Sequence, residues 1–226
     1  MSIKIKALAA VATLTLAGGL STVETLPAVA ATADCGPNCI QIFSAKFGTN
    51  ADPNFVETVS QGVAVVGQPT ILAVPSSSNP AGDFIATAPG KGLVSDFFDA
   101  GMVSAAVNEH YGSERAAQIE YAPFGEATGL CAGLATVAYQ NEGLTLQPCS
   151  IPGTTVWIIA TADSPATAPA RFPIVSGSNT VFTHPFAMTI HGNPAHKRFP
   201  QIVVQHLRGN PDHVRVAQLW GANILG

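Results

Sequence analysis

The chain has 226 residues, of which only 11% are charged, and its formal net charge is −4 at pH 7. An acidic balance of this kind argues against binding to nucleic acid, which requires a basic surface. The 21 glycines and 17 prolines, with abundant valine and alanine, favour a single all-β domain rich in turns.

The amino-terminal segment has the pattern of a secretory signal peptide. Lys4 and Lys6 form a basic start, residues 7–20 form an apolar run without a charge, and Ala-Val-Ala at residues 28–30 is a typical cleavage pattern. The apolar run is shorter than the roughly 20 residues that a membrane-spanning helix needs, and no later segment reaches that length. We therefore predict that residues 1–30 are removed and that the mature protein is secreted, extracellular and without a membrane span.

Four cysteines in an exported chain predict two disulfides, and four cysteines allow three pairings. Cys35 and Cys39 lie in one tight Gly-Pro-Asn loop, whereas Cys131 and Cys149 remain to close a loop across two candidate strands. We favour the two local bridges, Cys35–Cys39 and Cys131–Cys149. A four-thiol zinc site is disfavoured because exported thiols oxidise and a second close cysteine pair is absent.

Three segments of the chain follow one plan of four short strands, the last of which carries an aromatic residue. The strands are rich in β-branched and aromatic residues and are bordered by Gly or Pro, which is typical of short strands joined by turns. In chain order we expect them at residues 40–44, 55–59, 67–74 and 83–86, then 118–123, 130–134, 143–149 and 155–159, then 172–176, 186–190, 201–207 and 217–221. Three units of four strands predict a β-trefoil, in one domain spanning residues 31–226.

Residues 92–112, between the first and second units, interrupt the β pattern. Apolar residues pair four positions apart, as in Leu93 with Phe97 and Val103 with Val107, and Gly101 lies between the two pairs. We predict one bent or two short helices, an insertion whose apolar side packs on the barrel. It either covers an end of the barrel or forms the wall of a binding groove.

Two parts of the sequence resemble the ricin-type β-trefoil, whose units carry a Cys-Leu-Asp-Val-like strand and end in Gln-x-Trp. Residues 129–134 with 144–149 look like the family's disulfide-linked strand pair, and Gln218-Leu-Trp220 matches the second motif. Thr-Val-Trp157 and Gly-Asp-Phe84 match only in the aromatic residue, and the chain is also similar to a group of secreted actinomycete proteins of unassigned activity. Since a trefoil closes around a pseudo-threefold axis, we expect Phe84, Trp157 and Trp220 to fill its core.

No catalytic pattern stands out in the sequence, so we predict no catalytic residue, no metal and no cofactor. Gly-x-Ser-x-Gly and His-Glu-x-x-His are both absent. One acid–base cluster on the insertion is typical of solvated helix surface; it consists of Asn108, Glu109, His110 and Glu114. Five histidines crowd the third unit without the spacing of metal ligands, namely His184, His191, His196, His206 and His213.

The family resemblance implies glycan binding, with an acid in the second strand of each competent unit and an amide near the last strand. Glu57 is the only acid in register, because the second unit has Gly133 and the third has Met188. Asn79 is the candidate amide of the first unit, where a platform aromatic is absent. We therefore expect a monomeric, non-catalytic protein that binds a glycan or cell-wall polymer weakly through Glu57 and Asn79.

Two other functions remain open. Kunitz-type trefoils are of similar size with two disulfides and block proteases with one protruding loop. The candidate loops here are residues 75–80 and 193–200, and Lys197 and Arg198 in the second would suit a trypsin-like pocket. The third hypothesis is a secreted hydrolase whose site follows no motif known to us.

Overall fold

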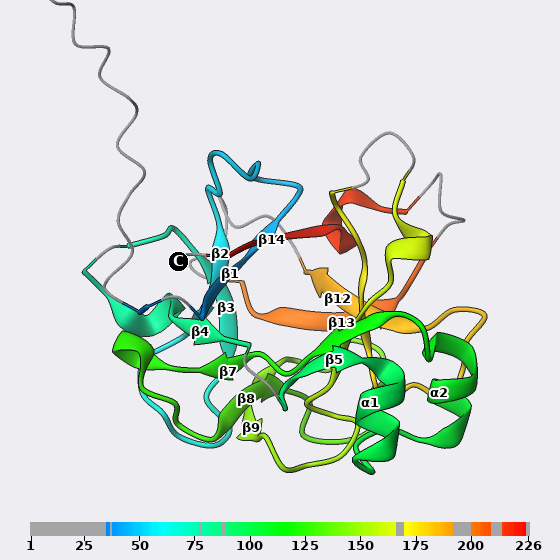
Figure 1. Ribbon diagram of the computed structural model, residues 1–226. Coiled ribbons are helices and arrows are strands. Elements are labelled where there is room, and N and C mark those ends of the chain that lie inside the picture. The colour runs from blue at the N-terminus through cyan, green and yellow to red at the C-terminus, as the bar shows by residue number, and fades with distance from the viewer. Residues whose placement is uncertain are drawn as a thin grey trace, which may run out of the picture.

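The computed structural model describes residues 35–36, 38–76, 78–86, 89–165, 170–191, 200–208 and 214–224. These residues form fourteen strands and two α-helices (Figure 1). The strands are β1 (Cys39–Ser44), β2 (Val56–Val59), β3 (Thr70–Ala73), β4 (Phe84–Ile85), β5 (Lys91–Leu93), β6 (Arg115–Ala117), β7 (Glu120–Tyr121), β8 (Leu130–Gly133), β9 (Thr145–Pro148), β10 (Trp157–Ile159), β11 (Ile174–Ser176), β12 (Phe186–Ile190), β13 (Ile202–His206) and β14 (Trp220–Ile224). The helices are α1 (Val94–Asp99) and α2 (Ala105–Tyr111). The proposed signal peptide, residues 1–30, lies outside the described residues.

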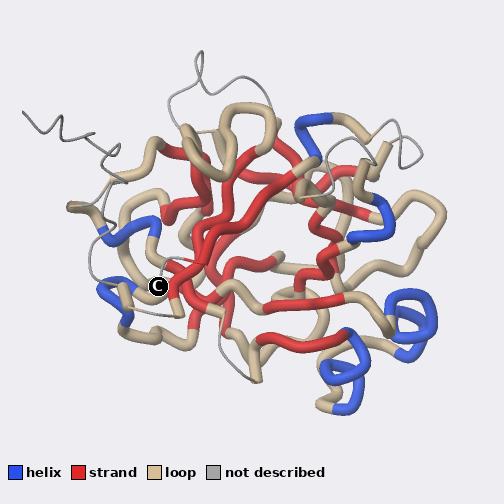
Figure 2. The backbone as a smooth tube through the Cα atoms, turned by 45° about the horizontal axis from the view of Figure 1, so that its top comes forward, coloured by secondary structure: helices blue, strands red, loops and turns tan. Residues whose placement is uncertain are grey.

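The first and last strands of the three units form a closed ring of antiparallel pairs. β1 pairs with β14 on one side and with β4 on the other, and β4 pairs with β7. β10 pairs with β6 and with β11. A bridge between Phe172 and Trp220 closes the ring between β11 and β14. The strands surround a common axis in Figure 2.

The middle strands of each unit form three hairpins that cap one end of this barrel. They are β2–β3, β8–β9 and β12–β13. Isolated bridges join the hairpins to one another in a cycle, namely Pro69 to Thr145, Ile71 to Gln201 and Gly143 to Val203. A six-stranded barrel capped by three hairpins is the β-trefoil, so the predicted all-β fold of three four-strand units is confirmed.

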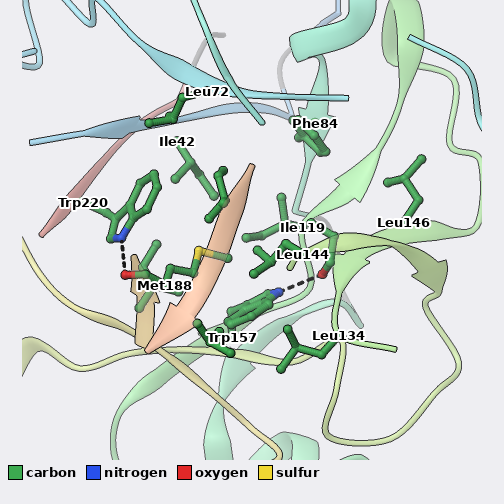
Figure 3. Packing of buried hydrophobic residues seen from close by; sticks show 14 of the residues in the cluster. Ile42, Leu72, Phe84, Ile119, Leu134, Leu144, Leu146, Trp157, Met188 and Trp220 are labelled. Carbon is green, nitrogen blue, oxygen red and sulfur yellow. Dashed lines mark hydrogen bonds between the residues drawn. The ribbon is translucent and has the colours of Figure 1, made fainter. Parts of the chain in front are cut away.

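The three aromatic residues expected on the axis are indeed in the core. Phe84, Trp157 and Trp220 are at most 1% exposed and belong to one apolar cluster (Figure 3). Each indole N–H donates to a backbone carbonyl, from Trp157 to Ala132 over 2.8 Å and from Trp220 to Met188 over 2.9 Å. The tryptophans therefore fill the core without leaving their polar atom unpaired.

The insertion contains the two short helices that the sequence predicts. Ser104 caps α2, since its hydroxyl accepts a hydrogen bond from the N–H of Val107 over 3.2 Å. Apolar side chains of both helices pack on the outer face of β10 and β11, and these are Val94, Phe97, Val107 and Tyr111 against Val156, Ile158 and Val175. The helices thus cover a side of the barrel, not one of its ends.

The insertion also carries a strand pair that the sequence analysis missed. β5 pairs with β6 directly before and after the helices, and β6 continues into β7 after a two-residue break. Lys-Gly-Leu and Arg-Ala-Ala lack the β-branched residues by which the other strands were found.

Both predicted disulfides are present. Cys35 is bonded to Cys39, and Cys131 to Cys149, with Cα atoms 5.8 Å and 5.0 Å apart. The second bridge connects β8 to the residue after β9, and Cys131 is completely buried. Among the described residues, the helices are all too short to span a membrane.

Candidate functional site

The indole hydrogen bonds define which residues of the three units are equivalent. Ala132 and Met188 receive the same bond in the second and third units. Each of them pairs across its hairpin with a buried apolar residue, Ala132 with Leu146 and Met188 with Val204. In the first unit the residue that pairs across the hairpin with a buried apolar residue is Glu57, whose partner is Leu72. The second-unit equivalent of Glu57 is therefore Ala132, and the predicted equivalence with Gly133 was wrong by one residue.

This register places the Glu57 side chain inside the core. Glu57 is 1% exposed, and neither carboxyl oxygen has a hydrogen-bond partner among the described residues. Burial raises the pKa of Glu57 to about 7; the nearby Thr70 hydroxyl opposes that rise, although the two groups do not reach hydrogen-bond geometry. The carboxyl that the sequence analysis proposed for ligand binding thus lies among core side chains and is not among the described residues that line the pocket of the first unit.

A pocket of about 370 Å³ does open on the first unit, and a glycine explains why it opens there. In the third unit the Gln218 side chain fills the corresponding space and donates to the Thr189 hydroxyl over 3.0 Å. Gly82 takes the place of Gln218 in the first unit, where a Cβ would lie 3.7 Å from the equivalent hydroxyl of Thr58. The missing side chain leaves room for a ligand above Thr58.

Two nearly buried polar side chains line this pocket without a full set of partners. Gln41 is 7% exposed, and its amide makes no hydrogen bond to a described residue. Asp83 is 6% exposed, and one of its carboxyl oxygens accepts a bond from the N–H of Phe124 over 3.0 Å. Its other oxygen has no partner in the part of the chain that the structure describes. An amide and a carboxylate therefore remain available to a ligand.

Burial raises the pKa of the Asp83 carboxyl above its usual value, and the hydrogen bond from Phe124 opposes that rise. A ligand that donates a hydrogen bond to the carboxyl would favour its ionised form. Asp83 is the acid of this pocket, in the place that Glu57 was expected to take.

Asn79, which the sequence analysis proposed as the candidate amide of the first unit, lines the same pocket. Its side-chain oxygen accepts a bond from the N–H of Ala81 over 3.0 Å, which leaves the amide N–H groups free to donate. The apolar residues of the lining are Val56, Ala73, Val74 and Pro75. No aromatic residue is among the lining residues, so a sugar ring would pack on aliphatic carbon instead of stacking on a ring.

The acid–base cluster of the insertion has a structural role. Glu114 accepts hydrogen bonds from the N–H and the hydroxyl of Thr161 and from the N–H of Ala162, over 3.2, 2.8 and 3.3 Å. The exposed ring of His110 stacks on Phe182 with ring centroids 4.8 Å apart. These contacts connect the end of the insertion to the segment that follows β10 and to Phe182.

The histidines of the third unit do not assemble a metal site within the described residues, where no group of three potential ligands occurs. The His206 ring stacks on Phe186 and contacts the carbonyl oxygen of His184 over 2.6 Å. His196 and His213, and the candidate inhibitor residues Lys197 and Arg198, lie outside the described residues.

Comparisons with known proteins agree with this fold. The crystal structure of a designed threefold-symmetric protein, ThreeFoil, superposes with a TM-score of 0.52 at 8% sequence identity, covering 82% of this chain and 97% of that one. Two further structures are more distant. The solution structure of the mdaA-1 domain has a TM-score of 0.49 at 10% sequence identity, covering 83% of this chain and 90% of that one. A Polyporus squamosus lectin bound to a sialylated epitope has a TM-score of 0.46 at 15% identity, covering 83% of this chain and 49% of that one. The threefold repeat is therefore shared, at identities that speak for the fold alone.

No family model and no curated protein matches the sequence. The resemblance to secreted actinomycete proteins therefore has no support from these comparisons.

Sequence reasoning missed Gln41 and Asp83. Asp83 stands inside the Gly-Asp-Phe84 segment that was aligned with Gln-x-Trp, but only its aromatic was considered. The glycine two residues before Phe84 was the available signal, because it replaces a large polar side chain with empty space. No signal in the sequence indicated Gln41. In the structure it lies between Ile40 and Ile42 of β1 and pairs in register with Asn223.

Proposed function

We propose that the protein is a secreted, non-catalytic binding protein that holds a glycan or a cell-wall polymer in the pocket of its first unit. The observation that carries this proposal is the pair of Gln41 and Asp83, both more than nine-tenths buried and both with unused hydrogen-bonding capacity. Sugar hydroxyls are donors and acceptors at once, and they match a carboxylate beside an amide.

The rest of the pocket supports the same ligand class. Asn79 adds amide donors at the rim, while Val74 and Pro75 offer aliphatic carbon to the apolar face of a sugar ring. Without an aromatic platform the affinity should be low, in the millimolar range, which corresponds to about −4 kcal/mol. Weak single sites are useful on polymers, where repeated units raise the local concentration of ligand. Both disulfides support an extracellular location, because the cytosol keeps thiols reduced.

Asp83→Asn is expected to weaken glycan binding about tenfold, since a charge-assisted hydrogen bond is worth about 1.5–3 kcal/mol and tenfold corresponds to about 1.4 kcal/mol. The amide oxygen of the variant still accepts the bond from Phe124, so the fold should be kept. Binding to a glycan array, followed by titration calorimetry with the best sugar, measures the change.

Two further variants make this test specific. Gly82→Gln places in the first unit the side chain that fills the third, and it should abolish binding by blocking the pocket. Asp96→Asn is the matched control, because Asp96 also accepts a bond from a backbone N–H, that of Leu93 over 2.7 Å, on the insertion. Retention of full binding by Gly82→Gln, or a wild-type protein that binds no sugar of the array, would contradict the proposal.

A further inference from the structure

The barrel contains a second pocket, at the end opposite the hairpin cap. It has a volume of about 480 Å³ and is lined by strands of all three units. The lining is almost entirely apolar, and the large side chains in it are Ile40, Ile42, Ile119, Trp157, Ile159, Phe172 and Ile174. The helices of the insertion cover the side of the barrel, and at this end residues of β5 and β6 line the pocket.

Small residues at inward positions explain the space. Ala222 pairs with Ile42 and Ala117 pairs with Trp157, so each alanine shares the inner face with a large apolar neighbour. Directly paired residues on antiparallel strands point to the same face. A core close-packed with larger side chains would have no such volume, because protein interiors leave few voids larger than a water molecule.

Two cationic side chains stand at the edge of the pocket. Lys91 pairs with Ala117, and Arg115 pairs with Ile159, so both belong to the same face as the apolar lining. Both side chains are exposed, and no acidic residue is among those that line the pocket. The chain as a whole has a formal net charge of −4, whereas the described lining of this pocket has two cations and no acid, so its local charge is positive.

We propose that this pocket binds a single-chain anionic amphiphile, a fatty carboxylate whose hydrocarbon chain enters the barrel while its head contacts Lys91 and Arg115. Its volume falls within the range of small-molecule sites, which are mostly apolar with a few polar groups that fix orientation. The apolar lining accounts for the chain, and the two cations account for an anionic head in place of a neutral one. This inference is independent of the glycan pocket, with which it shares no lining residue.

The two tryptophans of the chain make the proposal directly measurable. Both are buried in the core, but only Trp157 is among the residues that line the pocket. The probe is ω-bromodecanoate below its micelle concentration, because bromine quenches indole fluorescence on contact. In the Trp220→Phe variant, which keeps Trp157, the emission should be quenched with saturation. In Trp157→Phe it should stay unchanged. Phe84 already fills the equivalent place in the first unit, so phenylalanine is a mild replacement.

The head group and the chain are tested separately. Lys91→Gln with Arg115→Gln should weaken binding of the carboxylate about tenfold, as expected for a lost charge-assisted bond, and leave ω-bromodecanol unaffected. Ala117→Leu should abolish quenching by both probes because it fills the pocket. Equal quenching in the two tryptophan variants, no quenching of Trp157, or equal affinity of wild type for acid and alcohol would each overturn the proposal.

Discussion

Replacing Glu57 by methionine is expected to stabilise the protein by about 3 kcal/mol more at about pH 8 than at about pH 4. The reason is the position of the carboxyl, which is 1% exposed and has no hydrogen-bond partner among the residues that the structure describes. The third unit has the apolar side chain of Met188 at the equivalent place in the core. Methionine has nearly the same shape as glutamate and carries no ionisable group.

The direction of the pH effect follows from the raised pKa of Glu57. Its pKa rises from 4.5 to about 7 on folding, so between these values the folded protein holds a proton that the unfolded chain has released. Raising the pH through this window therefore lowers the free energy of unfolding, and the loss is complete once the buried carboxyl is ionised above about pH 7. Below about pH 4.5 both states are protonated and the contribution vanishes.

Urea unfolding of both proteins at the two pH values measures the effect, read as the difference between variant and wild type. Glu57→Gln should also remove the pH dependence but gain less, since its amide remains buried without a partner. Met188→Leu is the matched control, an apolar exchange at the equivalent position whose effect should not depend on pH. A gain for Glu57→Met that is the same at both pH values would show that the carboxyl is not the cause.

Removing the Cys131–Cys149 disulfide by alanine replacement of both residues is expected to cost about 3 kcal/mol of unfolding free energy. The bridge spans 18 residues, and its loss releases that loop in the unfolded chain. It also removes a contact between β8 and the end of β9, where Cys131 is completely buried.

The other disulfide is the natural comparison. Cys35 and Cys39 are separated by only four residues, so the same chain-entropy estimate gives about 2 kcal/mol for their replacement by alanine. Urea unfolding of the two double variants ranks the losses. A larger loss for the Cys35–Cys39 variant would mean that loop entropy does not dominate the stabilisation.

Most of the fold could be predicted from the sequence because each strand of the three units is short, apolar and bordered by Gly or Pro. The strands that were missed, β5 and β6, lack this composition. They are held by the pairing of β5 with β6 and of β6 with β10. A pairing that depends on tertiary neighbours leaves little trace in the local sequence.

The candidate site was harder to predict because it depends on which way each strand residue points. Glu57 and Val59 point inward while Thr58 lines the pocket, but Val56 is buried as well, so the sequence lacks a clean alternation of polar and apolar residues. The barrel-end pocket arises from alanines on strands far apart in the chain. Their meeting follows only from the closed ring of strands.

The pairing of β1 with β14 also determines how the barrel would respond to mechanical load. Ile40 pairs with Ile224 at one end of this ladder and Ser44 with Trp220 at the other, so both strands leave the barrel at the Ile40 end. The hydrogen bonds of an antiparallel ladder lie perpendicular to its strands. A force that draws these two ends apart therefore acts along the bonds and breaks them one pair after another, starting at the Ile40 end. The ladder between β1 and β14, which closes the ring, is therefore expected to open pair by pair under such a force.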